Sequence, residues 1–222
     1  MATRQSLQRW LPALGVVASA CVPVRYTEAF VPDAPVVRVV LEVERGSVEV
    51  VPGGSVRVER AVRGPAGAAA LAHHLSPDGT LTVEAGCPGV LPCGVDTRLS
   101  VPPSVPVAVA VDRGDVWVTG LEELQLDIAD GDADVEVGQR LVASLGTGSI
   151  RAWLGASTHA RVAVGQGNVD VQVPASSYDL DLTARTRDVE GVLPDGQADG
   201  HLEVIAPAGR ARVRGGRSVA RR

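Results

Sequence analysis

The chain has 222 residues and a formal net charge of −5, and every one of its 21 basic residues is Arg. A nucleic-acid-binding protein needs a concentrated basic surface to neutralise phosphates, so this acidic balance excludes general nucleic-acid binding. Aromatic residues make up only 3% of the chain, whereas Gly and Pro number 25 and 15. This composition excludes an all-helical fold and favours many short strands around a core of Val, Leu and Ala.

Residues 1–20 are predicted to be a signal peptide. Two arginines precede an apolar stretch from Trp10 to Ala20, which ends in small residues. This stretch is too short to span a bilayer as a helix, which needs roughly 20 apolar residues. We therefore expect the chain to be exported and this segment to be removed.

The residues Ala18-Ser19-Ala20-Cys21 resemble the lipobox of bacterial lipoproteins, in which a peptidase cuts before Cys and the thiol is acylated. The resemblance implies that Cys21 anchors an exported lipoprotein to a membrane of the cell envelope, in the periplasm or at the outer membrane. It departs from the usual pattern in having Ala18 where Leu is typical. The alternative is an ordinary signal peptide cut at the same small residues, which leaves a free or disulfide-bonded thiol.

The next predicted segments are a tether and a small β module. Residues 21–35 contain three prolines and little periodicity, which is typical of a tether. From Val36 to Val51 apolar and polar residues alternate on both sides of Gly46, which predicts a strand, a turn and a second strand. The run 67–75 is rich in Ala and Leu and predicts a short helical turn or a loop. The β module that contains these elements is expected over residues 36–102.

Cys87 and Cys93 flank a short loop within this module. In an oxidising compartment such close neighbours favour a disulfide. A zinc site is the alternative, but two cysteines without a nearby His or a second Cys pair make a weak ligand set. A bridge between these two residues leaves Cys21 unpaired, which acylation would explain.

Residues 103–215 repeat a turn-and-strand pattern of the form Gly-x-Val-x-Val. The copies begin at intervals of 17, 17, 19, 20 and 22 residues, at Gly114, Gly131, Gly148, Gly167, Arg187 and Gly209. A period of about twenty residues is typical of solenoids, in which each copy stacks on the next. We expect two strands per rung, with valines facing inward and glycine at the turn. The predicted fold class is therefore all-β, a β-solenoid of about five to six rungs that follows the small β module.

The chain ends in a predicted basic tail, residues 216–222. The basic cluster around it has no acidic residue after Glu203 and consists of Arg210, Arg212, Arg214, Arg217, Arg221 and Arg222. Such a cluster can contact anionic lipid or polysaccharide. The alternative is a solvated, frayed end.

The run from Val36 to about Gly215 resembles the bacterial putative-adhesin family of repeated β-strand domains. The resemblance is carried by Gly46-Ser47-Val48-Glu49-Val50, by Cys93 to Pro102, and by the turns at Gly114, Gly148 and Gly167. The family typically shows T-G-S-G-D-V at such turns, and Gly146-Thr147-Gly148-Ser149-Ile150 is close to it. The resemblance implies a β-solenoid of the cell surface or envelope, with adhesion as the inferred role.

The sequence has no recognisable catalytic centre, and we expect no enzyme activity and no cofactor. The four histidines, His73, His74, His159 and His201, fit neither a hydrolase nor a metal-ligand template. Acidic residues recur near the turns, at Asp115, Asp130, Asp132, Asp134, Asp170 and Asp188. They are open to three interpretations: calcium between rungs, a carboxylate pair for glycoside cleavage, or side chains that cap strand ends.

Trp117 and Trp153 are the candidate glycan contacts. They stand on strands of different copies and can lie on one face, where exposed aromatic rings stack on sugars. The alternative is a role in the core or at an edge. The leading hypothesis is a non-catalytic lipoprotein with a structural, adhesive or scaffolding role, in contact with the membrane through its lipid and with polysaccharide or another surface protein.

The rival hypothesis is a protein that binds or degrades envelope polysaccharide. A groove that gathers Trp117 or Trp153 with several carboxylates favours this rival, whereas a uniformly polar surface favours the scaffold. A signalling component associated with an anti-σ factor is a third option, and the lack of any predicted transmembrane helix argues against it.

Overall fold

The structure, a computed structural model, describes residues 24–65, 67–89, 92–155, 158–174, 178–192 and 200–216. Regular structure in these residues consists of strands, so the all-β prediction is confirmed, and 15 strands share one hydrogen-bonded sheet. No helix in the described ranges is long and apolar enough to cross a membrane. The predicted signal peptide, Cys21 and residues 217–222 lie outside the described residues.

The strands, in chain order, are β1 (Val24–Phe30), β2 (Arg38–Arg45), β3 (Val48–Pro52), β4 (Arg57–Gly64), β5 (Ala70–Leu75), β6 (Thr80–Gly86), β7 (Gly94–Val101), β8 (Val107–Arg113), β9 (Val116–Asp130), β10 (Ala133–Thr147), β11 (Ile150–Leu154), β12 (His159–Gln166), β13 (Val169–Pro174), β14 (Tyr178–Glu190) and β15 (Gly200–Gly216).

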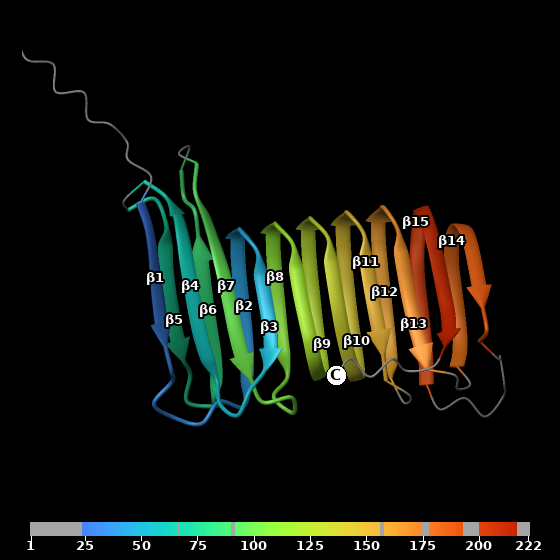
Figure 1. Cartoon of the computed structure of the whole chain (residues 1–222), viewed down its shortest axis with the longest axis horizontal. Coiled ribbons are helices and arrows are strands. Elements are labelled where there is room, and N and C mark those ends of the chain that lie inside the picture. Colours follow the sequence, from blue (N-terminus) through green and yellow to red (C-terminus); the bar gives the residue numbers. More distant parts are fainter. Residues whose placement is uncertain are drawn as a thin grey trace, which may run out of the picture.

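The strands stack side by side in two layers (Figure 1). The front layer runs in the order β1, β4, β7, β3, β9, β10, β11, β13, β15, β14, and the back layer in the order β5, β6, β2, β8, β9, β10, β12, β15, β14. The long strands β9, β10, β14 and β15 contribute to both layers, which joins the layers into one sheet. Pairing is parallel throughout, except where β1, β4 and β5 meet their neighbours at the N-terminal end.

The space between the layers is filled by small apolar side chains. In β10, Ala133, Val135 and Val137 are buried, while Asp134 and Glu136 between them point outward. The same alternation runs through most strands because successive side chains point to opposite faces of a sheet. A core of Val, Leu, Ile and Ala is thin, as the low aromatic content predicted, and each fully buried Val or Leu stabilises it by about 1.5–3 kcal/mol.

A column of glycines lies at the turns that join the two layers. Gly46, Gly114, Gly131, Gly148 and Gly167 all have positive φ, between 131° and 153°. A Cβ on each would collide with the carbonyl oxygen of the residue below, at 1.8 Å for Gly114 over Gly46 and 1.9 Å for Gly131 over Gly114. Glycine is therefore required at this place by both conformation and space. The predicted turn positions are confirmed.

Spatial order differs from chain order at both ends of the stack. The last strand of the chain, β15, lies between β14 and the pair β12 and β13. Gly209 consequently stacks on Gly167, and the copy at Arg187, which lacks the glycine, forms part of the outermost strand. The intervals between copies grow along the sequence. This growth does not mean that the copies become wider in space, because the copy at Arg187 does not lie between the two copies that flank it in the sequence.

Residues 24–30, inside the range predicted as a tether, form strand β1. This strand pairs antiparallel with β4 over its whole length. Glu28 on β1 forms an ion pair with Arg60 on β4 at 2.8 Å, and the Phe30 ring stacks on His73 with centroids 4.0 Å apart. This strand forms although its own residues show little periodicity, because partners distant in the sequence stabilise it.

The run 67–75, predicted as a helical turn or a loop, contains β5 instead. β5 pairs antiparallel with β6, from Ala70 opposite Gly86 to Leu75 opposite Leu81. Pairing with an existing strand outweighs the modest helix preference of Ala and Leu. The β module expected over 36–102 also shares the sheet of the repeats, because β3 pairs with β7 on one side and with β9 on the other.

The Cys87–Cys93 disulfide predicted from the sequence is present, with a Cα–Cα distance of 5.6 Å. It closes the connection between β6 in the back layer and β7 in the front layer. The backbone N–H of Cys87 also donates to the Glu44 carboxylate at 2.6 Å, which ties this connection to the end of β2. The bridge thus supports the N-terminal part of the stack.

Candidate ligand-binding groove

Trp117 and Trp153 both lie on the outer face of the front layer. Trp117 on β9 is opposite Asp134 on β10, and Glu136 of the same strand is opposite Trp153 on β11. The predicted common face is therefore present, with one strand between the two rings. Trp117 is 45% exposed, whereas Trp153 is partly covered, with the Arg151 guanidinium 6.0 Å from its ring centroid.

A shallow groove of about 490 Å³ surrounds Trp117 but does not include Trp153 among its lining residues. It extends across β9, β10, β11 and β13, and its polar lining consists of Asp115, Asp132, Asp134, Ser149, Arg151, Asn168 and Asp170. Four carboxylates and one guanidinium therefore surround one exposed indole.

The residues directly after the turn glycines line the groove and form hydrogen bonds between neighbouring strands. The N–H of Asp132 donates to Asp115 Oδ1 at 3.0 Å, and the N–H of Ser149 donates to Asp132 Oδ1 at 2.7 Å. Asn168, at the equivalent position further along the stack, accepts from the N–H of Arg210 at 3.3 Å through its side-chain oxygen. These contacts support the interpretation of Asp115 and Asp132 as turn-capping residues.

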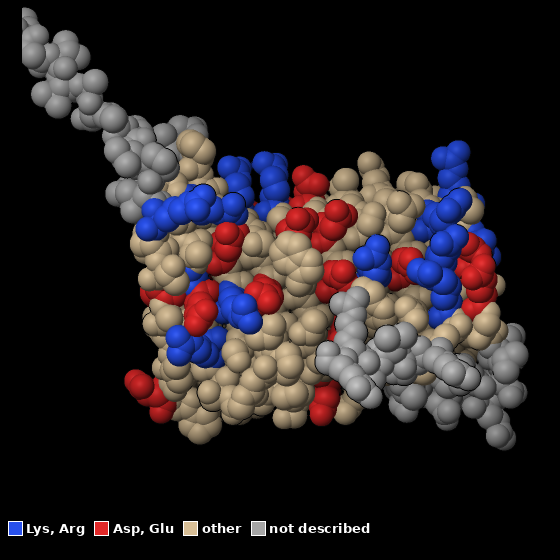
Figure 2. All heavy atoms as spheres, in the orientation of Figure 1, with Lys and Arg blue, Asp and Glu red and all other residues tan. Residues whose placement is uncertain are grey.

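One line of outward side chains crosses the front layer at a single register position and alternates in charge. From β4 to β14 it consists of Glu59, Arg98, Glu49, Trp117, Asp134, Arg151, Asp170, Arg212 and Asp188. Figure 2 shows red and blue groups alternating across this face, with a tan stretch between two red groups. Neighbouring members form ion pairs, such as Arg98–Glu49 at 3.1 Å and Arg212–Asp188 at 2.8 Å. Trp117 is the one uncharged member of the line.

Two of the three described arginines of the basic cluster predicted near the C-terminus form ion pairs. Arg212 pairs with Asp188, and Arg214 pairs with Asp170 at 2.5 Å. The hydrogen bond with Asp188, together with the charge of that carboxylate, raises the pKa of Arg212 above its ordinary value. Arg212 and Arg214 are therefore held in ion pairs and do not form a free basic surface, since β13 and β14 bring acids from earlier in the chain.

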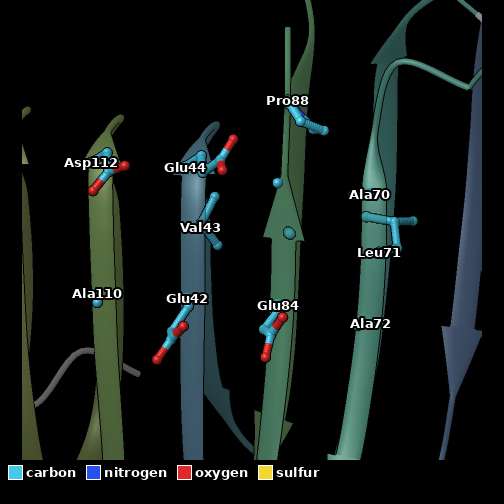
Figure 3. Close-up of a pocket in the computed structure, with 12 residues that line it drawn as sticks. Glu42, Val43, Glu44, Ala70, Leu71, Ala72, Glu84, Pro88, Ala110 and Asp112 are labelled. Atoms are coloured by element: carbon cyan, nitrogen blue, oxygen red, sulfur yellow. The ribbon is translucent and has the colours of Figure 1, made fainter.

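A second hollow, of about 510 Å³, lies on the back layer over β5, β6, β2 and β8 (Figure 3). Its charged lining is entirely acidic: Glu42, Glu44, Glu84 and Asp112. No exposed aromatic ring lines it. In the described ranges no group of three or more His, Cys, Asp or Glu side chains is arranged to hold a metal ion.

The histidines do not assemble with the groove. His159 on β12 lies opposite His201 on β15, and His201 Nδ1 is 3.0 Å from the Asp179 carboxylate on β14. The sequence pattern does not reveal this row of His159, His201 and Asp179, because β15 meets β12 only through the exchanged order of the last strands. His73 packs against Phe30, and His74 is exposed on β5.

No family model and no curated protein matches the chain. Among solved structures, it is similar to one described as a "putative cell adhesion protein" from Clostridium sporogenes, with 12% identity and a TM-score of 0.53, covering 88% of this chain and 100% of the other. A "putative adhesin" from Parabacteroides merdae has 10% identity and a TM-score of 0.31, with 85% and 95% covered. At such identity the Clostridium structure shows a common fold and nothing further.

Proposed function

We propose that this chain is an exported, non-catalytic surface protein of the cell envelope that binds polysaccharide through the groove at Trp117. The observation that carries the proposal is the groove itself, in which an exposed indole lies beside four carboxylates, an amide and a guanidinium. An aromatic ring stacks on the apolar face of a sugar, while carboxylates and amides form hydrogen bonds with the hydroxyl groups of the sugar. Both kinds of contact come together at Trp117.

We further propose that the repeated part is a β-solenoid and that it serves to hold this groove rigid. The parallel pairing of β8 to β15 and the glycine column support this name. Groove residues lie on four neighbouring strands about 4.8 Å apart, so the groove follows the stack. A long polymer suits such a surface better than a compact small molecule.

The groove is better suited to holding a ligand than to cleaving one. Asp134 and Asp170 form ion pairs with Arg151 and Arg214, at 3.7 and 2.5 Å. Asp115 and Asp132 accept backbone hydrogen bonds at the turns. Glycoside cleavage needs a pair of carboxyl groups free to act on the glycosidic bond, whereas each carboxylate of this groove is already engaged by a guanidinium or a backbone N–H.

Export and lipid anchoring at Cys21 remain part of the proposal, as the sequence predicts them. The likeness in fold to a "putative cell adhesion protein" supports a place at the surface, where the partner is polysaccharide or another surface protein. A lipid anchor at one end of an elongated stack would present the groove away from the membrane.

The test is a glycan array with the purified mature chain, repeated with Trp117→Ala. We expect binding to a subset of polysaccharides and a loss of about fivefold to tenfold in affinity on removing the ring. Trp153→Ala is the matched control, because that ring lies on the same face outside the groove, and its affinity should be unchanged within about twofold. A chain that binds no glycan, or binds equally after Trp117→Ala, would refute the proposal and leave a structural role.

A further inference from the structure

The geometry points to a positively charged ligand group above Trp117, and we infer that the polysaccharide bound there carries protonated amines, as a deacetylated amino sugar does. This inference rests on the proposed function and specifies its substrate class. It follows from three features of the front layer: the interrupted charge line, the net charge of the groove, and the difference between the two tryptophans.

The first feature is the place of Trp117 in the alternating line. Each inner member of the line that does not border Trp117 lies between two neighbours of opposite charge, as Arg151 does between Asp134 and Asp170. Trp117 lies between Glu49 and Asp134, two carboxylates, so it occupies the position at which the alternation requires a cation. The strands of Glu49 and Asp134 are about 10 Å apart, which leaves room for an ammonium group over the ring between them.

The second feature is the charge of the groove. Four carboxylates and one guanidinium line it, and Arg214 pairs with one of these carboxylates, Asp170, which leaves a formal excess of two negative charges. Such a hollow raises the local concentration of cations and disfavours anionic polymers. An acidic polysaccharide, such as one containing uronic acids, therefore does not fit.

The third feature is the contrast between the two aromatic rings. Trp153 has the Arg151 guanidinium 6.0 Å from its centroid, within reach of a cation–π contact. Over Trp117 no such guanidinium lies in the described part of the chain, and the ring is 45% exposed. Trp is the best of the aromatic side chains at binding cations. Its face is thus accessible to a cation from outside the molecule.

The test compares two oligosaccharides of equal length, an oligomer of glucosamine and an oligomer of N-acetylglucosamine, by calorimetry at low salt and at a pH that keeps the amine protonated. We expect the mature chain to bind the glucosamine oligomer about tenfold more tightly, and this preference to shrink as salt is added. Equal or tighter binding of the N-acetylated oligomer would overturn the inference while leaving the proposed function in place. If neither oligomer binds and the glycan array is also negative, both proposals fail.

Two variants sharpen the test. Trp117→Arg completes the alternating line with a cation of the protein's own and should abolish binding of the glucosamine oligomer while the chain stays folded. The double variant Glu49→Gln with Asp134→Asn keeps the ring and removes the flanking charges, so it should lose the preference for glucosamine. Trp153→Ala is again the control and should retain the preference. Persistence of tight glucosamine binding in either groove variant would overturn the inference.

Discussion

The two ends of the stack are built differently. At the N-terminal end β1, β4 and β5 pair antiparallel with their neighbours, and Arg60 lies 1% exposed between the layers. Its guanidinium donates to the Ala72 and Glu84 carbonyls at 3.0 and 3.2 Å and pairs with Glu28. At the C-terminal end the outermost described strand is β14, parallel to β15, with inward-facing Leu180 and Leu182 only half-buried.

The comparison teaches how a repeating stack ends. A parallel strand at the end of the stack leaves its core side chains and its outer backbone groups uncovered, so termination requires a change of pattern. The N-terminal end changes strand direction and places a hydrogen-bonded charge in the core. The C-terminal end exchanges the order of the last two strands, which puts the rung that lacks the column glycine, at Arg187, on the outside.

The largest effect is expected between these ends, where the glycine column is continuous. Gly131→Ala should lower the free energy of unfolding by about 4 kcal/mol, because the Cβ would lie 1.9 Å from the Gly114 carbonyl oxygen and the residue has positive φ. Urea unfolding measures this change. The control is Gly54→Ala, whose Cβ meets nothing within 4 Å, and a comparable loss there would show that the column has no special role.

The next largest effect is expected at the N-terminal end. Arg60→Ala should lower the free energy of unfolding by about 3 kcal/mol, since two carbonyls inside the stack and the Glu28 carboxylate lose their partner. The same urea titration applies. Arg57→Ala on the same strand removes an outward, half-exposed side chain and should cost under about 1 kcal/mol. If the two variants behave alike, the buried arginine does not secure this end.

The smallest effect is expected at the C-terminal end. Leu182→Ala should cost only about 1 kcal/mol, because the side chain is half-buried on the outermost described strand. Leu126→Ala, at a position 1% exposed in the middle of the stack, should cost about 3 kcal/mol. Equal losses at the two positions would mean that the C-terminal end is covered as well as the interior, and the difference between the two ends would disappear.

Much of the repeat could be predicted from local pattern, and the candidate groove could be predicted only in part. Alternation placed Trp117 and Trp153 on one outer face, because side-chain direction along a strand has a period of two. The groove includes only one of them, since Arg151 packs against Trp153 and the carboxylates gather around Trp117. Glu49 lies opposite Trp117 on the adjacent strand β3, more than sixty residues earlier in the chain, and no periodicity in the sequence connects the two.

The sequence by itself determined the strands of the repeat, the turn glycines, the small-residue core and the Cys87–Cys93 bridge. These depend on interactions within about twenty residues, where φ preference, alternation and chain proximity act directly. Only the tertiary structure decided the order of strands at the two ends, and with it β1, the buried Arg60, the row of His159 and His201, and the neutralised arginines. Such features depend on which distant strand supplies the adjacent backbone, and many pairings satisfy the same local pattern.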